Sequence, residues 1–236
     1  MLLSEFDYEL PEELIAQMPA DKRQNSRMMV LNRDDNTILH KHFYDIVDLI
    51  DENSLLVLNN TKVIPARLFA HKDTGALIEI FLLKECLNKH WEVLIKPSKR
   101  VKCAMVLEIC PKLSIEIVER YNDGKWLAKL IYDGNLYEIL DEVGNIPLPP
   151  YIERKMTNDE LKSLDFERYQ TVYAKKEGSV AAPTAGLHFT DEILESLKAK
   201  GVEIAYVTLN VGLGTFRPVK CDNVLEHKMD SEKFEI

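Results

Sequence analysis

Four stretches of the chain carry side chains that could do chemistry, and the first is Asn59 to Arg67. It places two amides, a hydroxyl, an ammonium and a guanidinium within nine residues, a set that can recognise a polar, anionic ligand. Because the stretch follows the hydrophobic run 55–58, its side chains should emerge at the carboxyl end of a buried strand, the usual edge for ligand sites in α/β folds. The alternative is a loop whose asparagines satisfy its own backbone.

The second stretch, residues 180–190, is a run of small residues that ends in His188 and Phe189. Small side chains let a ligand approach the backbone closely, and the helix that should follow Thr190 offers N–H donors at its start. His188 is the best candidate for a general acid or base, because the pKa of imidazole lies nearest the working pH. The alternative is a packed, hydrogen-bonded histidine beside apolar neighbours.

The other two stretches are less specific. Residues 211–218 bring Gly212 and Gly214 to the end of an expected strand, but no Gly-Lys-Ser/Thr follows and no third spaced glycine completes a dinucleotide motif, so a tight turn explains them equally well. Residues 226–232 have the composition of a metal site, yet their ligand spacing is undefined, and a charged surface is the better interpretation. We predict no metal site.

The charge distribution points to an anion-binding surface in the middle of the chain. The formal net charge is −9, which by itself argues against a polyanionic partner. Residues 59–102, however, hold nine basic and four acidic side chains. Within them Pro97 rules out a continuous central strand, so the adjacent cations should project from a loop and suit phosphate contacts. These cations are Lys96, Lys99, Arg100 and Lys102. The alternative is a merely solvated face.

The elements that position these stretches are of mixed type. A hairpin is expected around residues 33–36, a helix over 43–50 and a buried strand over 54–58. Short β-type runs at the spacing of a small antiparallel barrel follow, at 63–70, 76–83, 91–95, 106–109, 114–118 and 126–132. After them come helices over 136–143 and 191–200 and a strand over 202–209.

We therefore predict a mixed α/β (α+β) fold, with an α/β core domain built from both chain ends and an inserted antiparallel β-barrel-like domain. The Pro-rich segment 147–151 breaks regular structure at the boundary between them. The core domain should comprise residues 1–68 and 146–236, and the inserted all-β domain residues 69–145.

Composition excludes several classes. The chain has 236 residues, 46% of them hydrophobic and 29% charged, which is typical of a soluble globular protein and not of collagen or a disordered chain. No apolar run approaches the ~20 residues that cross a bilayer, and the N-terminus lacks a signal-peptide pattern. The four cysteines show no zinc spacing and are expected to be reduced. We expect a cytoplasmic monomer without a membrane partner.

Taken together, these stretches resemble one family, the S-adenosylmethionine:tRNA ribosyltransferase-isomerases of queuosine biosynthesis. The motifs occur in family order along essentially the whole chain, and the run 181–189, Ala-Ala-Pro-Thr-Ala-Gly-Leu-His-Phe, is highly specific. The matching segments are residues 6–11 with 15–16, 59–68, 147–152, 168–173, 181–189 and 212–216.

The resemblance implies transfer and isomerisation of the ribosyl moiety of S-adenosylmethionine onto 7-aminomethyl-7-deazaguanine at the tRNA wobble position. The product is epoxyqueuosine-tRNA, and adenine and methionine are released. S-adenosylmethionine would be a consumed substrate, and no cofactor is expected. The partners implied are S-adenosylmethionine and tRNA.

The resemblance also implies roles for individual residues. His188 and Thr184 are the catalytic candidates, with His188 as the acid or base. Substrate contacts are assigned to Asn59, Asn60, Thr61, Arg67, Ala185, Gly186, Phe189, Gly212, Gly214, Thr215 and Phe216. Phosphate contacts with tRNA are assigned to Lys62, Lys96, Lys99, Arg100 and Lys102.

This chain departs from the family pattern in three places. Asn210 and Asp230 stand where the family usually has histidine, and the further motifs Thr-Thr-Ser-x-Arg and Thr-Asn-Phe-His, which lie beyond this point in family members, are not in the sequence. Two hypotheses therefore remain. The chain is the enzyme, seen as a fragment or completed by another polypeptide, or it is a truncated, catalytically silent member that retains only tRNA binding or the fold.

Overall fold

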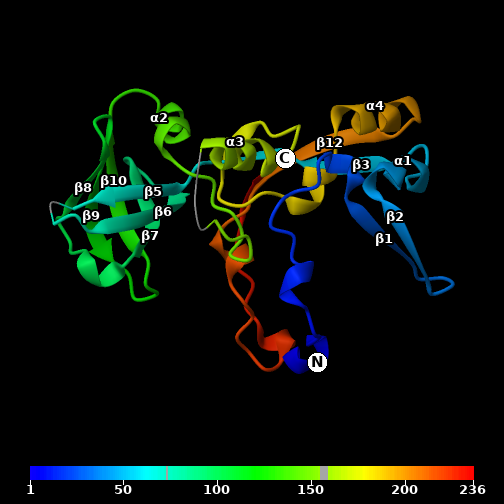
Figure 1. The fold of residues 1–236 in the computed structure, drawn as a ribbon, viewed down its shortest axis with the longest axis horizontal. Helices are drawn as coiled ribbons and strands as arrows, with labels where there is room; N and C mark the ends of the chain where they lie inside the picture. The colour runs from blue at the N-terminus through cyan, green and yellow to red at the C-terminus, as the bar shows by residue number, and fades with distance from the viewer. Residues whose placement is uncertain (73, 155–158) are drawn as a thin grey trace.

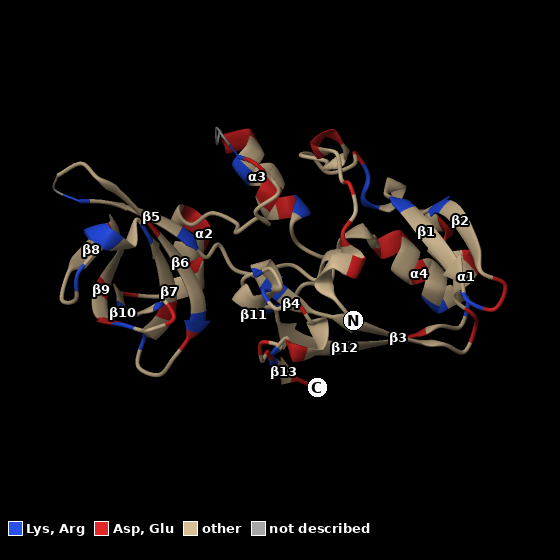
Figure 2. Ribbon diagram, turned by 90° about the horizontal axis from the view of Figure 1, so that it is seen from below, with Lys and Arg blue, Asp and Glu red and all other residues tan. Residues whose placement is uncertain are grey.

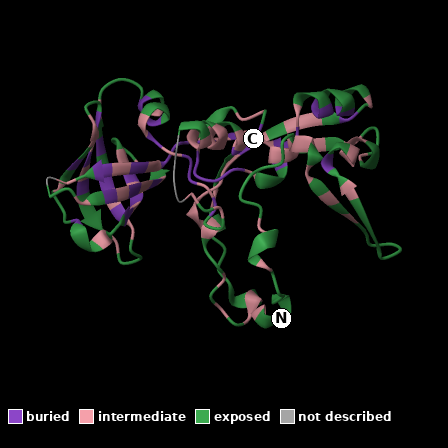
Figure 3. Cartoon of the chain, viewed as in Figure 1, coloured by how far each residue is buried: buried purple, intermediate pink, exposed green. Residues whose placement is uncertain are grey.

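The computed structural model describes residues 1–72, 74–154 and 159–236. The molecule is elongated, with a β-barrel at one end and a small sheet covered by helices at the other (Figure 1). Two largely exposed arms, the N-terminal segment and the segment that follows residue 210, project from the middle. Figure 3 shows the buried segments gathered in the barrel and along the helical end.

The barrel is a six-stranded antiparallel sheet in the order β5-β6-β7-β10-β9-β8, and its two edge strands approach each other so that it is nearly closed. Alternate side chains point inward and are buried, as a period of two requires. The inward set includes Ile78, Ile80, Val93, Ile115 and Leu130. The strands are β5 (Arg67–His71), β6 (Leu77–Glu85), β7 (His90–Lys96), β8 (Val106–Cys110), β9 (Leu113–Arg120) and β10 (Trp126–Tyr132).

Helix α2 (Leu136–Val143) closes one end of the barrel. Asn135 caps it by accepting a hydrogen bond from the N–H of Tyr137. Just beyond it, the backbones of Arg67 and Asn145 exchange two hydrogen bonds, with N···O distances of 3.1 and 2.9 Å. The chain therefore enters and leaves the barrel at the same place.

The other end of the molecule combines segments from before and after the barrel. Strand β3 (Leu55–Asn59) pairs in parallel with β12 (Glu203–Asn210), and β13 (Lys233–Glu235) pairs antiparallel with β12. A second parallel pair joins β4 (Thr61–Val63) to β11 (Lys176–Ser179). Helix α4 (Asp191–Ala199), capped by the Thr190 hydroxyl, buries Leu197 against the sheet that contains β3 and β12.

The remaining elements are short. A hairpin of β1 (Arg27–Asn32) and β2 (Thr37–His42) leads into η4 (Phe43–Asp45) and α1 (Ile46–Leu49). Helix α3 (Asp159–Arg168) lies between the two ends of the molecule (Figure 1). The other 3-10 turns are η1 (Leu3–Phe6), η2 (Glu12–Leu14), η3 (Arg23–Asn25), η5 (Ser98–Arg100), η6 (Thr184–His188), η7 (Leu213–Phe216) and η8 (Val224–Glu226).

The predicted fold class is confirmed, because a mixed α and β chain contains a barrel-like antiparallel sheet and joins its two ends through parallel strand pairs. One expected element is wrong. Residues 63–70 are not one strand, since Pro65 lacks an N–H and the chain bends between β4 and β5. Within the described ranges, no helix is long and apolar enough to span a membrane.

Candidate active site

The polar side chains of residues 59–61 are held inside the sheet. The Asn59 side-chain oxygen accepts hydrogen bonds from the N–H groups of Leu209 (3.0 Å) and Thr61 (3.2 Å), and its amide nitrogen donates to the Leu209 carbonyl (2.9 Å). The Asn60 oxygen accepts from the Thr208 hydroxyl at 2.7 Å. The fully buried Thr61 donates its hydroxyl to Asn210 at 2.8 Å. These contacts join β3 and β4 to β12.

We therefore expect Asn59→Ala to destabilise the fold. Removal of the amide leaves two backbone N–H groups and one carbonyl without their partner in a partly buried site, which should cost about 2 kcal/mol of unfolding free energy. Chemical denaturation measures the loss. The matched control is Asn122→Ala on an exposed turn of the barrel, where φ is not positive. An unchanged midpoint for Asn59→Ala would show that the amide does not hold the strands together.

Residues 184–189 form a compact turn whose two faces differ. Thr184 and Ala185 are exposed, whereas Phe189 is buried with its ring edge against Phe43, 4.9 Å between centroids. Gly186 fits because it has no Cβ, which would overlap the Tyr173 hydroxyl oxygen and lie 2.9 Å from Cγ2 of Thr171. The exposed face of this turn is therefore that of Thr184 and Ala185.

His188 is half-buried and lies 5.3 Å from the Phe43 ring. Desolvation by burial lowers the pKa of its imidazole, a hydrogen bond with the backbone of Arg23 raises that pKa, and the positive charge of Arg23 lowers it. The Arg23 guanidinium also donates to the carbonyls of Leu187 (3.1 Å) and Glu167 (2.6 Å), so it fixes the turn to the end of α3. A neutral imidazole at neutral pH suits a proton acceptor.

The lowered pKa of His188 predicts a pH dependence of stability. The folded protein binds this proton less readily than the unfolded chain, whose histidine pKa is about 6.5. Stability associated with His188 is therefore fully present above that pH and is lost as the pH falls through the lowered folded pKa. Urea denaturation from pH 7.5 to 5 should show a steeper loss for the wild-type chain than for His188→Gln. If the unfolding free energies of the two proteins fell equally with pH, the pH dependence would not come from His188.

The segment before β13 packs on the turn that contains Gly212 and Gly214 and hydrogen-bonds to it. The N–H of Gly212 donates to both carboxylate oxygens of Glu232, at 3.0 and 2.9 Å. A Cβ on Gly214 would lie 2.5 Å from a carboxylate oxygen of Asp230, which also pairs with Arg217 at 3.7 Å. The carboxylate of Asp230, where the family pattern has histidine, thus packs on this turn.

Two cavities lie on either side of the turn, and Leu213 lines both. The first, which we call the linker cavity, has a volume of about 550 Å³. It lies between the outer surface of β5–β7, the Pro-rich segment 145–150 and α3. The predicted site residues that line it are Arg67, Lys96 and Phe216.

The second, which we call the glycine-turn cavity, has a volume of about 670 Å³ and is lined by Gly212, Gly214 and Glu232 together with residues of the barrel and of α2. One of these is Tyr137, whose pKa is raised to about 12, chiefly because burial penalises the phenolate and also because Glu85 lies near it. Tyr137 therefore stays protonated as a hydrogen-bond donor in a cavity rich in carboxylates.

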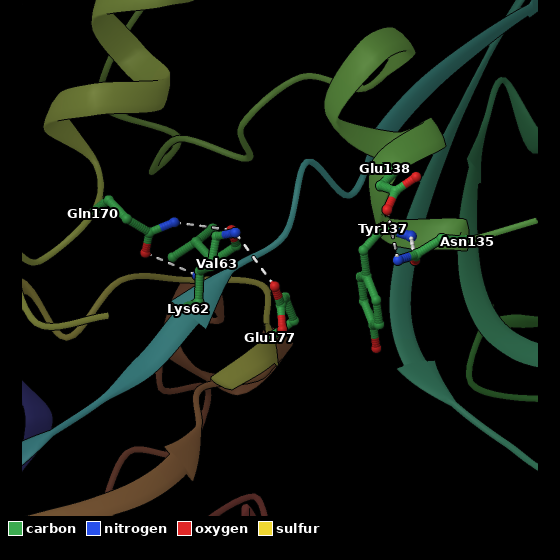
Figure 4. Close-up of polar contacts among 7 residues, drawn as sticks. All are labelled: Lys62, Val63, Asn135, Tyr137, Glu138, Gln170 and Glu177. Carbon is green, nitrogen blue, oxygen red and sulfur yellow. Dashed lines mark hydrogen bonds and ion pairs between the residues drawn. The ribbon is translucent and has the colours of Figure 1, made fainter. Parts of the chain in front are cut away.

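Sequence reasoning missed Gln170. Its side-chain amide hydrogen-bonds to the backbone of β4 in the way that the backbone of a neighbouring strand would. Its oxygen accepts from the N–H of Val63 at 2.9 Å and its nitrogen donates to the Val63 carbonyl at 3.0 Å (Figure 4). Next to it, Lys62 forms an ion pair with Glu177 at 3.3 Å. Glu232 and Tyr137 were also missed as lining residues. The signal for Gln170 was its place in the motif 168–173.

The predicted RNA-contacting cations are spread over two places. Lys62 lies on β4, whereas Lys99 and Arg100 lie in η5, shortly after β7, with Lys96 before them and Lys102 after them in the sequence. Figure 2 shows basic stretches, in blue, both on β4 and on the barrel. The ammonium of Lys72 donates to the Arg100 carbonyl at 3.0 Å and so adds a fifth cation to this surface. Lys96, Lys99, Arg100 and Lys102 are all exposed.

The structure therefore does not bring all the predicted site residues together in one place. Arg67, Lys96 and Phe216 meet at the linker cavity, and Gly212 and Gly214 meet at the glycine-turn cavity. His188, Thr184, Ala185, Gly186 and Phe189 line neither cavity, and Thr215 is exposed on η7. Across residues 1–72, 74–154 and 159–236, no group of three or more metal-ligating side chains is present.

Comparisons with known proteins bear on the whole chain. The family model described as queuosine biosynthesis protein matches residues 3–236. A protein of Fusobacterium nucleatum named S-adenosylmethionine:tRNA ribosyltransferase-isomerase is 50% identical over 236 residues, which is 99% of this chain and 65% of that protein. A protein of the same name from Staphylococcus saprophyticus is 51% identical over 238 residues, 100% of this chain and 68% of that protein.

Among solved structures, an S-adenosylmethionine tRNA ribosyltransferase from Thermotoga maritima matches with 37% identity and a TM-score of 0.35, over 89% of this chain and 59% of that one. The chain spans about two thirds of the length of the two curated relatives, 65% and 68%. The family-model match nevertheless runs from residue 3 to residue 236, nearly the full chain. The chain therefore belongs to the queuosine biosynthesis protein family.

Proposed function

We propose that this chain carries out the reaction that the names of its relatives state, acting on S-adenosylmethionine and tRNA as a ribosyltransferase-isomerase. Its finer description is transfer and isomerisation of the ribosyl moiety onto 7-aminomethyl-7-deazaguanine to give epoxyqueuosine-tRNA, with release of adenine and methionine. No resident cofactor takes part. The observation that carries the proposal is the match of the family model to residues 3–236, which includes every predicted site residue.

The proposed chemistry begins with removal of a proton from the carbon next to the sulfonium, where the positive sulfur stabilises the developing carbanion. Rearrangement then expels adenine, which takes up a proton as it leaves. The amine of the tRNA base bonds to the sugar and loses a proton, and methionine leaves with the sulfur and the electron pair of its bond to the sugar. His188 supports the role of base because its lowered pKa keeps the imidazole neutral. The exposed Thr184 and Ala185 give substrate a path to this turn.

The test incubates the chain with S-adenosylmethionine and precursor tRNA and follows free adenine by chromatography. We expect adenine to appear only when both substrates are present, with methionine in equal amount. A longer relative such as the Staphylococcus saprophyticus protein serves as the positive control. Precursor tRNA that binds without any release of adenine would contradict the enzymatic proposal and support a binding-only role.

The exposed cations of η5 predict a salt-dependent contact with tRNA. Neutralising both Lys99 and Arg100 with glutamine should reduce the slope of log affinity against log salt by about 2, because each phosphate contact releases counterions. Filter binding over a salt series measures it. The control replaces Lys129 and Lys198, which are equally exposed but lie elsewhere. An unchanged slope for the η5 variant would show that this surface does not contact tRNA.

A further inference from the structure

The outer surface of the barrel that faces the linker cavity alternates aromatic and charged side chains. On neighbouring strands, Phe81 pairs with Arg67 on one side and Leu94 on the other, while Glu79 pairs with Phe69 and Lys96. All six line the cavity. Aromatic side chains set among cations are typical of the platforms on which unpaired bases stack.

The charges at the cavity leave a positive excess. Both lining carboxylates are already paired. Glu79 accepts from Arg67 at 2.7 Å, and Asp165 accepts two hydrogen bonds from Arg154 at 3.0 and 2.8 Å in a largely buried pair. The other two lining cations, Lys96 and Lys162, form no ion pair with a carboxylate in the described part of the chain. The linker cavity therefore has two ammonium groups without a carboxylate partner, of which that of Lys162 lies 5.8 Å from the centroid of the Phe166 ring.

The phenylalanine rings at the cavity differ in whether another side chain covers them. The guanidinium carbon of Arg67 lies 5.1 Å from the centroid of Phe69 and covers that ring. Phe81, from the barrel, and Phe216, from η7, take part in no aromatic or cation–π pair among the described residues. Phe81 also packs partly against the barrel core, so a planar ligand would contact the part of its ring that lines the cavity. The proline side chains of the segment 147–150 add apolar walls.

We infer that the linker cavity binds one unpaired nucleotide of RNA, with its base stacked on Phe81 and its phosphates near Lys96 and Lys162. The volume of about 550 Å³ lies within the usual range of small-molecule sites and suits a single nucleotide, whereas a paired base inside a duplex could not enter. RNA is favoured over a free small molecule because Lys96, at the cavity, leads directly into the exposed cations of η5. The inference rests on the proposed action on tRNA.

The test measures binding of a fluorescent single-stranded RNA of about eight nucleotides, and of a duplex of the same length, without S-adenosylmethionine. Phe81→Leu keeps an apolar side chain on the barrel but removes the stacking face, and should weaken single-strand binding about 10-fold. Phe81→Trp should retain it. Phe234→Leu, at an exposed ring on β13, is the matched control and should bind as the wild-type chain does. Thermal unfolding of each variant verifies that the barrel is intact.

The outcomes separate this inference from the proposed enzymatic function, since adenine release is not measured. Equal affinity of wild-type and Phe81→Leu for the single strand would overturn it, as would equal losses in Phe81→Leu and Phe234→Leu. Equilibrium dialysis with S-adenosylmethionine alone is the second arm. If Phe81→Leu weakened binding of S-adenosylmethionine and left RNA binding unchanged, the cavity would belong to that substrate and the inference would fall.

Discussion

Replacing Gly144 by alanine should lower the unfolding free energy of the chain by about 3 kcal/mol, the upper part of the usual range for overpacking. A Cβ at this position would overlap the Pro65 carbonyl oxygen and lie 2.7 Å from both the Leu140 carbonyl oxygen and Cβ of Pro65. Two of these atoms belong to the backbone and cannot rotate away. The overlap falls where the chain leaves α2 and passes the segment entering the barrel, so relief would require the two segments to separate.

The control for this prediction is Gly75→Ala on the turn between β5 and β6. A Cβ there meets nothing within 4 Å, but the φ of +78° is strained for alanine, so it should cost about 1 kcal/mol. Urea denaturation of both variants separates overlap from backbone strain. Equal losses for the two would show that the contact with Pro65 relaxes without cost.

His188→Gln should slow adenine release by about 100-fold in single-turnover reactions, since that is the lower part of the range for loss of a general base. Glutamine retains hydrogen-bonding capacity and similar bulk beside Phe43, so the turn 184–188 should keep its conformation. In the wild-type chain the rate should fall at acid pH, as His188 becomes protonated below its lowered pKa. The measurement is free adenine against time at several pH values.

The control for His188 is His40→Gln on the exposed hairpin strand β2, which should react at the wild-type rate. If His188→Gln released adenine as fast as the wild-type chain, the imidazole would be a packing residue, and another group would have to remove the proton. An acid limb that persisted in the His188→Gln variant would lead to the same conclusion.

Local patterns predicted most of the fold. Alternating apolar residues in β6 and β7 match their buried and exposed positions, and the Thr190 cap and Gly201 correctly bracket α4. Strand β11, Lys176–Ser179, could not be predicted, because its sequence has no apolar alternation and it forms only through pairing with β4. Tertiary context decides such strands.

The candidate site was less predictable than the fold. The motifs pointed to segments of the chain, but they did not show that the side chains of Asn59 and Thr61 hydrogen-bond to β12, which no pattern within residues 59–67 could reveal. The sequence also did not show which site residues lie together. Phe216 and Arg67 line the same cavity, whereas His188 does not line it. Distances between segments far apart in sequence depend on packing, and spacing along the chain does not encode them.

The paired backbones of Arg67 and Asn145 have a consequence for the order in which the chain acquires structure during synthesis. Every strand of the barrel lies between these two residues, so all its pairings can form as soon as Asn145 has emerged from the ribosome. Strand β3 is made earlier yet must wait for β12 before it has a neighbour. We therefore expect the middle of this polypeptide to mature first, with its beginning completed last.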